Sequence, residues 1–335
     1  MSPKFLELYR TGELERRVLQ LERLLESCTI CPKDCGNNRL KDEIAACYSG
    51  RFPIVSSFTA HFGEEPVLSG TGGAGNIFFG NCNLRCVYCQ NYQISQEWKE
   101  QKRNEITFER LAEMMLELQS KGCHNIGFVS PTHFAPQMAR GILLAAEKGL
   151  RLPIVYNTNA YDSVEVLKLL DGIVDIYLPD LKYAENEAGF QYSKVRGYTD
   201  FARLAIKEMF RQMGDELVFD ENGLLKRGLL IRLLVLPNDL AGIEENMRWI
   251  RDELSPKTAI SLMAQYYATN KAATDERYIL LSRRISMREW SKTIDILEDL
   301  GMQEGFMQEY ESASYYYRPD FNDKDKPFKD IRGFQ

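Results

Sequence analysis

Six short apolar runs alternate with helical patterns between residues 76 and 300 of the chain. The apolar runs read as strands near 76–80, 124–129, 153–157, 173–178, 229–235 and 258–263. The helical patterns follow near 107–121, 136–148, 162–170, 198–213, 241–253 and 286–300. Strand–helix units in unbroken succession favour parallel strands joined by crossover helices. Six units are fewer than the eight of a full barrel, so we predict an α/β fold with a partial, open six-unit barrel of the TIM type.

Residues that typically begin or end helices support these boundaries. Gly122 ends the first helical pattern, and Pro136 suits the first position of the second. Ser286 and Glu289 have the spacing of a capping box, and Gly301 stands just past the other end of that helix.

The flanking regions suggest three parts: an N-terminal segment (1–50), the barrel (51–309) and an extended tail (310–335). Residues 13–27 read as an amphipathic helix packed on the barrel. The tail contains Tyr315, Tyr316 and Tyr317 and a charged run, and we interpret it as an extended surface segment in preference to a strap across the barrel mouth. His61, Glu64 and Glu65 precede the first strand and are expected to be solvated.

The composition limits the class of protein, its cellular location and its partners. Hydrophobic residues make up 44% and charged residues 27% of the 335 residues, as in a globular protein. No run of about 18 apolar residues predicts a membrane span, and the N-terminus lacks the pattern of a signal peptide, so we expect a cytoplasmic protein with no membrane partner. The net charge of −6 argues against nucleic acid as a partner.

Three cysteines lie directly after the first predicted strand, with the spacing C-x3-C-x2-C: Cys82, Cys86 and Cys89. Iron–sulfur clusters normally take four cysteines, so three thiolates would leave one iron open to a ligand. The alternatives are buried apolar cysteines, which need no fixed spacing, and a zinc site, which usually pairs two-cysteine knuckles. No second knuckle follows this loop.

A separate set of four cysteines precedes the barrel: Cys28, Cys31, Cys35 and Cys47. Eight cysteines in a cytosolic chain favour metal or redox chemistry over disulfides. Four thiols close a coordination sphere, so this set predicts a structural or electron-transferring site. Zinc and an auxiliary iron–sulfur cluster both suit it.

Polar side chains cluster where the predicted strands end. In α/β barrels these carboxyl ends carry the chemistry. The relevant segments are Ser130-Pro131-Thr132-His133, Asn157-Thr158-Asn159, Asp180-Leu181-Lys182, Arg232 on the fifth strand, and Gln265-Tyr266 after the sixth.

The cysteine loop, with aromatic Tyr88 before its last cysteine, resembles the signature of the radical S-adenosylmethionine (SAM) enzymes. The stretch from Cys28 to Glu309 looks like their pyruvate formate-lyase-activating-enzyme-like branch, in which a similar cysteine segment precedes the barrel. The resemblance implies a 4Fe–4S cluster on Cys82, Cys86 and Cys89, with SAM bound at the open iron.

The resemblance also assigns SAM contacts. Ser130, Thr132 and His133 stand where the family has a Gly-Gly-Glu motif, which departs from its best-known members. Asn157 and Asn159 would bind the ribose or carboxylate of SAM. The remaining implied contacts are Tyr88, Asp180, Lys182 and Arg232. A family histidine near the sixth strand end is replaced here by Gln265 and Tyr266.

The implied activity is reductive cleavage of SAM to a 5′-deoxyadenosyl radical, which abstracts a hydrogen from a substrate. The closest resemblance is to activases of glycyl-radical enzymes, with flavodoxin or ferredoxin as the electron donor. The alternatives are a radical SAM enzyme acting on another protein, peptide or small molecule, and a non-catalytic iron–sulfur electron carrier. A carrier would leave the polar strand ends unexplained.

Overall fold

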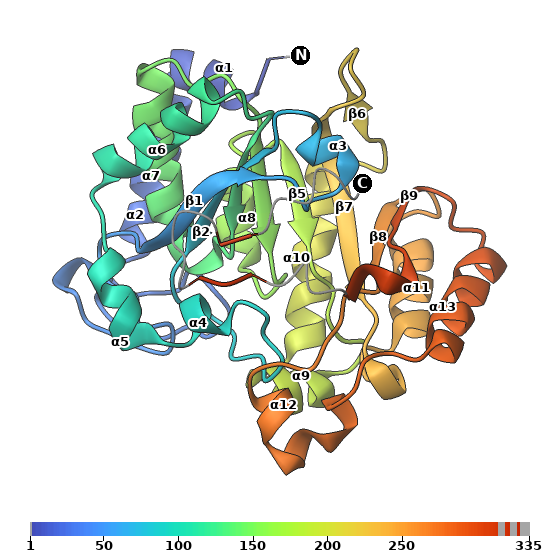
Figure 1. Ribbon diagram of the computed structural model, residues 1–335. Coiled ribbons are helices and arrows are strands. Elements are labelled where there is room, and N and C mark those ends of the chain that lie inside the picture. Colours follow the sequence, from blue (N-terminus) through green and yellow to red (C-terminus); the bar gives the residue numbers. More distant parts are fainter. Residues whose placement is uncertain (1, 314–318, 322–326, 329–335) are drawn as a thin grey trace.

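One open, curved sheet organises the molecule (Figure 1). The computed structural model describes residues 2–313, 319–321 and 327–328. The strand order is β1-β2-β3-β4-β5-β7-β8-β9, and β6 pairs with β7. The strands are β1 (Val55–His61), β2 (Ala74–Phe79), β3 (Ile126–Val129), β4 (Ile154–Thr158), β5 (Ile176–Pro179), β6 (Val218–Phe219), β7 (Leu225–Leu234), β8 (Ala259–Met263) and β9 (Gly305–Met307).

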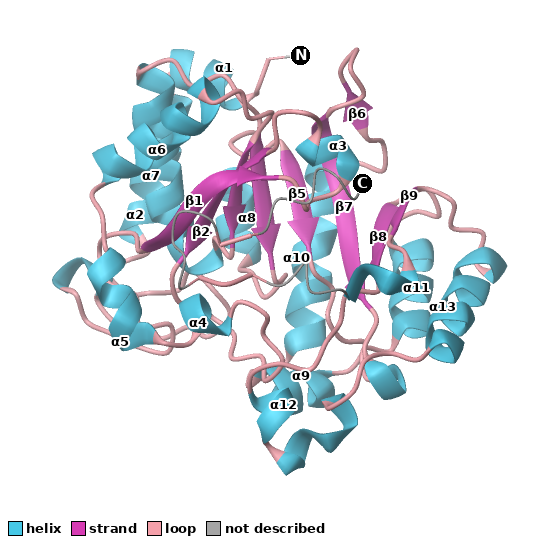
Figure 2. Ribbon diagram, in the orientation of Figure 1, coloured by secondary structure: helices cyan, strands magenta, loops and turns pink. Residues whose placement is uncertain are grey.

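Helices cover the outer face of this sheet (Figure 2). The longer ones are α1 (Phe5–Arg10), α2 (Glu13–Arg23), α6 (Phe108–Ser120), α7 (Ala135–Glu147), α8 (Val164–Leu170), α9 (Asn186–Ser193), α10 (Tyr198–Met213), α11 (Ile243–Glu253) and α13 (Met287–Asp299). One-turn helices are α3 (Pro66–Ser69), α4 (Tyr92–Ser95), α5 (Trp98–Gln101) and α12 (Lys271–Thr274). The capping box predicted at Ser286 and Glu289 is present.

The predicted six parallel strands are confirmed as β2, β3, β4, β5, β7 and β8. Together they form the predicted partial barrel, and the sheet does not close on itself. Two edge strands extend it. β1 pairs antiparallel with β2, and β9 adds a parallel strand beside β8. The three residues of β9 are too short a run to show strand periodicity in the sequence.

The predicted N-terminal helix is α2. Leu14, Val18 and Leu21 are buried on one face of it, and that face packs mainly on α7. The guanidinium of Arg140 on α7 donates to Glu22 of α2, with Nε to Oε1 at 2.8 Å. The N-terminal segment is therefore fixed to the outside of the barrel.

The amino ends of the strands are closed by an apolar cluster. It contains Leu68 of α3 with Val155, Ile176 and Leu230 from three strands. Because β1 runs antiparallel to β2, its chain returns to this end of the sheet before α3 begins. The loop after β1 therefore lies beneath the interior of the barrel.

The described part of the tail lies against the barrel. Phe321 is buried, and its ring stands 5.5 Å from that of Phe78 on β2. Phe328 packs on Phe78 and His61. The expectation of a surface segment is wrong for these residues, because their aromatic rings cover inward side chains of β1 and β2. Tyr315, Tyr316 and Tyr317 lie outside the described residues.

Within the described part of the chain, no helix is both long and apolar enough to cross a bilayer.

Candidate functional site

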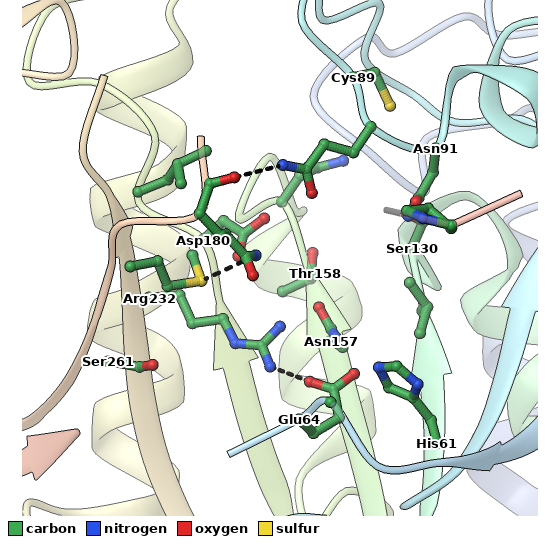
Figure 3. A pocket seen from close by; sticks show the side chains of 18 of the residues that line it. His61, Glu64, Cys89, Asn91, Ser130, Asn157, Thr158, Asp180, Arg232 and Ser261 are labelled. Atoms are coloured by element: carbon green, nitrogen blue, oxygen red, sulfur yellow. Dashed lines mark hydrogen bonds and ion pairs between the residues drawn. The ribbon is translucent and has the colours of Figure 1, made fainter. Parts of the chain in front are cut away.

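A cavity of about 800 Å³ runs along the inner face of the sheet. Cys89 and Asn91 lie at one end of it, and Glu64 and His61 lie at the other (Figure 3). The end with Cys89 and Asn91 lies next to the loops that follow the carboxyl ends of the strands. The other end reaches the loop after β1. The cavity thus connects the cysteine loop with the lower part of the barrel.

All three cysteines of the loop line this cavity. The Sγ of Cys82 accepts hydrogen bonds from Leu84 N at 3.4 Å and from Nδ2 of Asn159 at 3.5 Å. The Sγ of Cys86 lies 3.0 Å from the Oγ of Ser193, and Cys89 Sγ lies 3.2 Å from Ser95 Oγ. Each sulfur therefore has its own polar neighbour, and hydrogen bonds to sulfur tune a bound cluster.

Backbone contacts hold the loop in place. Arg85 N donates to Ser193 O at 3.0 Å, and Val87 N donates to Tyr192 O at 2.8 Å. The Arg85 guanidinium donates to carbonyl oxygens within the loop, including that of Cys82 at 2.6 Å, and to Ala46 O at 2.9 Å. These bonds tie the loop to α9 and to the segment that carries the four N-terminal cysteines.

Burial favours the neutral thiol form of Cys86 and Cys89. Burial raises the pKa of Cys86 above its ordinary value and that of Cys89 to about 12. The thiolate form, which binds metal, is therefore disfavoured unless positive charge is supplied next to it. A metal centre supplies that charge, so the loop's chemistry suits metal binding.

Most of the polar residues predicted at the strand ends meet in this cavity. Asp180 and Lys182 form an ion pair there, with Nζ to Oδ2 at 2.7 Å. The hydroxyl of Tyr88 donates to that of Tyr183 at 2.8 Å. The predicted SAM contacts that line the cavity are Tyr88, Ser130, Asn157, Asn159, Asp180, Lys182 and Arg232.

Thr132 and His133 lie behind the cavity wall instead. The hydroxyl of Thr132 shares a hydrogen bond with that of Thr158 at 3.0 Å. Nε2 of His133 lies 3.0 Å from Gly80 O. Because a carbonyl only accepts, Nε2 carries the proton, and His133 holds the residue that leads into the cysteine loop. Burial lowers the pKa of His133 to about 3, so its imidazole is neutral.

His61, Glu64 and Glu65 are not solvated, as their sequence context suggested, but line the inner end of the cavity. The Arg232 guanidinium binds Glu65 side-on, with Nε to Oε1 at 2.9 Å and Nη2 to Oε2 at 2.7 Å. Nη2 also contacts Glu64. This partner lies on β7, far along the chain, so local sequence gives no sign that the carboxylates are buried.

The four N-terminal cysteines lie near one another. Burial and the neighbouring thiols of Cys47, Cys28 and Cys35 raise the pKa of Cys31 to about 12. Cys28, Cys31 and Cys47 are buried, and Cys35 is exposed. Among the residues described, no three His, Cys, Asp or Glu side chains have the arrangement of a formed metal site. The predicted metal at these cysteines stays a prediction.

The chain is similar to a protein family and to two proteins of known sequence. The family model of the radical SAM superfamily matches residues 76–226. An uncharacterized protein of Methanocaldococcus jannaschii, MJ0674, is 30% identical over 298 residues, which cover 88% of this chain and 80% of that protein. A second protein of that organism, MJ0808, also uncharacterized, is 25% identical over 231 residues, covering 66% of this chain and 62% of that protein.

Solved structures of the FeFe-hydrogenase maturase HydG resemble this chain more remotely. One crystal structure has a TM-score of 0.47 and 13% identity, and the match covers 69% of this chain and 50% of that chain. The structure from Carboxydothermus hydrogenoformans has a TM-score of 0.42 and 15% identity, with coverage of 70% and 58%.

Proposed function

Because the chain belongs to the radical SAM superfamily, we propose that Cys82, Cys86 and Cys89 bind a 4Fe–4S cluster at which SAM is reductively cleaved. The observation that carries this proposal is that the three sulfurs line one cavity at the carboxyl ends of the parallel strands. The donor set fits the cluster: three thiols from one loop, each with a polar neighbour. When bound, the cluster supplies the electron that converts SAM to methionine and a 5′-deoxyadenosyl radical.

The side chains around the cavity then bind and orient SAM. Asn159, which contacts Cys82 Sγ, would bind and orient SAM beside the cysteine loop. The Asp180–Lys182 pair offers both a carboxylate and an ammonium group at the end of β5. The loop cysteines Cys82 and Cys86 and the neighbouring Tyr88 are buried, and shielding from water would protect a reactive intermediate from side reactions.

For the substrate, we propose hydrogen abstraction from a glycine of a glycyl-radical enzyme. This finer assignment rests on the C-x3-C-x2-C loop with Tyr88 before its last cysteine and on the cysteine segment that precedes the barrel, which resemble the pyruvate formate-lyase-activating-enzyme-like branch. The second candidate is another protein, peptide or small molecule. It is favoured by the polar side chains at the inner end of the cavity, which SAM cleavage at the cysteine loop does not require.

We further propose that Cys28, Cys31, Cys35 and Cys47 bind a second metal centre, either zinc or an auxiliary cluster. Flavodoxin or ferredoxin would deliver the electron, and the protein would work in the cytoplasm. The clustering of the four thiols supports the metal proposal.

SAM cleavage separates an enzyme from an electron carrier. The anaerobically reconstituted protein, reduced with dithionite, is expected to release 5′-deoxyadenosine from SAM. A carrier with an intact cluster would be reduced and reoxidised without forming this product, and that result would refute the enzyme assignment.

A further inference from the structure

The inner end of the cavity has a polar floor, which we define as Arg232, Glu64, Glu65 and His61 (Figure 3). The backbone of Arg232 on β7 pairs with that of Asp180, just past the end of β5, and its guanidinium turns toward the two glutamates in the loop after β1. The cysteine loop lines the opposite end of the cavity, where Cys89 lies. Arg232, a SAM contact by resemblance, thus directs its guanidinium to the glutamates at the end of the cavity away from Cys89.

One donor of the floor is open. The Arg232 side chain is 11% exposed, and its Nε and Nη2 are taken by Glu65 and Glu64. Its Nη1 has no hydrogen-bond partner among the described residues, and Figure 3 shows it pointing away from Glu64 toward the middle of the cavity. Because Arg232 lines the cavity, this N–H can donate to a ligand oxygen there, and a hydrogen bond to a charged donor is stronger than one between neutral groups.

The charge of the floor argues against an anion as that ligand. A lone arginine in a cavity typically binds carboxylate or phosphate, but the charge of Arg232 is already matched by two carboxylates. Burial raises the pKa of Glu64, but Arg232, His61 and the hydrogen bond from Asn76 together outweigh burial and leave that pKa below its ordinary value. Glu64 is therefore ionised, and together with Glu65 it outweighs the single guanidinium charge.

Acidic residues also outnumber basic residues over the whole cavity. Of the charged residues that line it in the described part of the chain, four are acidic and two are basic: Glu64, Glu65, Asp180 and Glu309 against Lys182 and Arg232. Burial lowers the pKa of His61 below its ordinary value, so this side chain adds no positive charge. At the floor, away from the cysteine loop, an anionic group would meet net repulsion.

The wall beside the floor is aromatic. The His61 ring lies 4.1 Å from that of Phe328 and 6.5 Å from that of Phe78, measured between centroids. A group that reaches Arg232 therefore has a hydrogen-bond donor below it and apolar rings at its side. Such surroundings suit an uncharged group with a carbonyl or hydroxyl oxygen.

We propose that this floor is the substrate subsite, that it takes an uncharged group whose oxygen accepts a hydrogen bond from Nη1 of Arg232, and that it selects against anions. This inference rests on the proposed function. A backbone amide of a glycine-containing segment and an uncharged small molecule both present such an oxygen.

Matched amide and acid probes test the proposal on the cluster-loaded protein with SAM bound. N-acetylglycinamide and N-acetylglycinate represent a backbone segment, and nicotinamide and nicotinate represent a small molecule. Dissociation constants are measured by saturation-transfer NMR. At least one amide is expected to bind about tenfold tighter than its acid, which corresponds to one hydrogen bond to a charged donor. The preferred pair identifies the source of the oxygen.

Two substitutions test whether the preference for amides over acids arises at the floor. Glu64→Gln removes one negative charge and is expected to shrink the amide preference at least severalfold. Glu187→Gln, at an exposed position of α9, is expected to leave it unchanged. The proposal is overturned if no amide binds, if the acids bind as tightly as the amides, or if Glu64→Gln leaves the ratio unaltered. Formation of 5′-deoxyadenosine without probe, measured in parallel, reports the proposed function separately.

Discussion

Asn159 links the end of β4 to the first cysteine of the loop: its Nδ2 donates to Cys82 Sγ at 3.5 Å and to Asn83 Oδ1 at 2.8 Å. Its Oδ1 accepts from Tyr161 N at 3.0 Å, which fixes the orientation of the amide. The side chain therefore joins a sulfur expected to bind iron to a strand end expected to bind SAM.

Replacing this asparagine should impair the cluster without unfolding the barrel. Asn159→Ala removes a hydrogen bond to a ligand sulfur, and losses of this kind cost about 10- to 100-fold in metal affinity or activity. The iron and sulfide content per chain and the rate of 5′-deoxyadenosine formation per cluster measure the two effects. Asn125→Ala is the matched control, because Asn125 is also buried but donates to Leu68 O. An equal loss in both variants would contradict the assigned contact.

His133 should make stability fall as the pH falls. Its pKa is lowered by burial to about 3, from an ordinary value of 6.5. Below pH 6.5 the unfolded chain binds a proton that the folded protein does not, so unfolding is favoured by up to about 1.4 kcal/mol per pH unit. His133→Gln retains a donor for Gly80 O but does not titrate. Denaturant unfolding at pH 7.5 and 5.5, with matched metal content, should show a flatter dependence in this variant.

A second variant at this position separates the two roles of the side chain. His133→Leu cannot donate, so it leaves the Gly80 carbonyl unpaired, and its cost at pH 7.5 is expected to be about 1–3 kcal/mol. If the pH dependence of His133→Gln equals that of the unaltered protein, the buried neutral imidazole is ruled out as its source.

The ion pairs of the floor should contribute unequally to stability. Glu65 binds Arg232 through two oxygens and also accepts from Ser261 Oγ at 2.8 Å. Removing one partner of a buried pair costs about 3–5 kcal/mol, so we expect a loss of this size for Glu65→Gln. Glu64→Gln should cost less, because Glu65 still matches the guanidinium. Urea denaturation compares the two, and the reverse order would contradict the described geometry.

The N-terminal cysteines should retain metal when the loop cysteines are removed. The protein with Cys82, Cys86 and Cys89 all replaced by Ala is expected to keep one metal centre, measured as zinc, iron and sulfide per chain. Retained zinc identifies a structural site, and retained iron with sulfide identifies an auxiliary cluster. Adding Cys31→Ala should release the metal. A metal-free triple variant would show that these thiols bind none.

Much of the fold was accessible from the sequence because its signals are local. The periodicity of Phe108–Ser120 and the caps at Ser286 and Gly301 depend on neighbouring residues, and the structure has those elements. The lining of the cavity by Cys82, Cys86 and Cys89 follows from the position of their loop after β2.

The sequence-based predictions that differ from the structure concern residues whose contacts are with distant parts of the chain. Glu65 meets Arg232 across 167 positions of sequence, and no local pattern shows that such a carboxylate is buried. His133 follows a strand end, as a cavity residue would, but its ring turns toward Gly80. Phe321 belongs to a charged segment, yet it is buried against β2. Each outcome depends on the path of the chain in space.

The central claim is that the thiols of the cysteine loop hold the centre that cleaves SAM. The most direct measurement is 5′-deoxyadenosine formed from SAM by the reduced, reconstituted protein, by Cys86→Ala, and by Cys123→Ala as a control. Cys123 is equally a buried cysteine, but it does not line the cavity. We predict product from the unaltered protein and from Cys123→Ala, and none from Cys86→Ala. Undiminished product from a folded Cys86→Ala variant would contradict the claim.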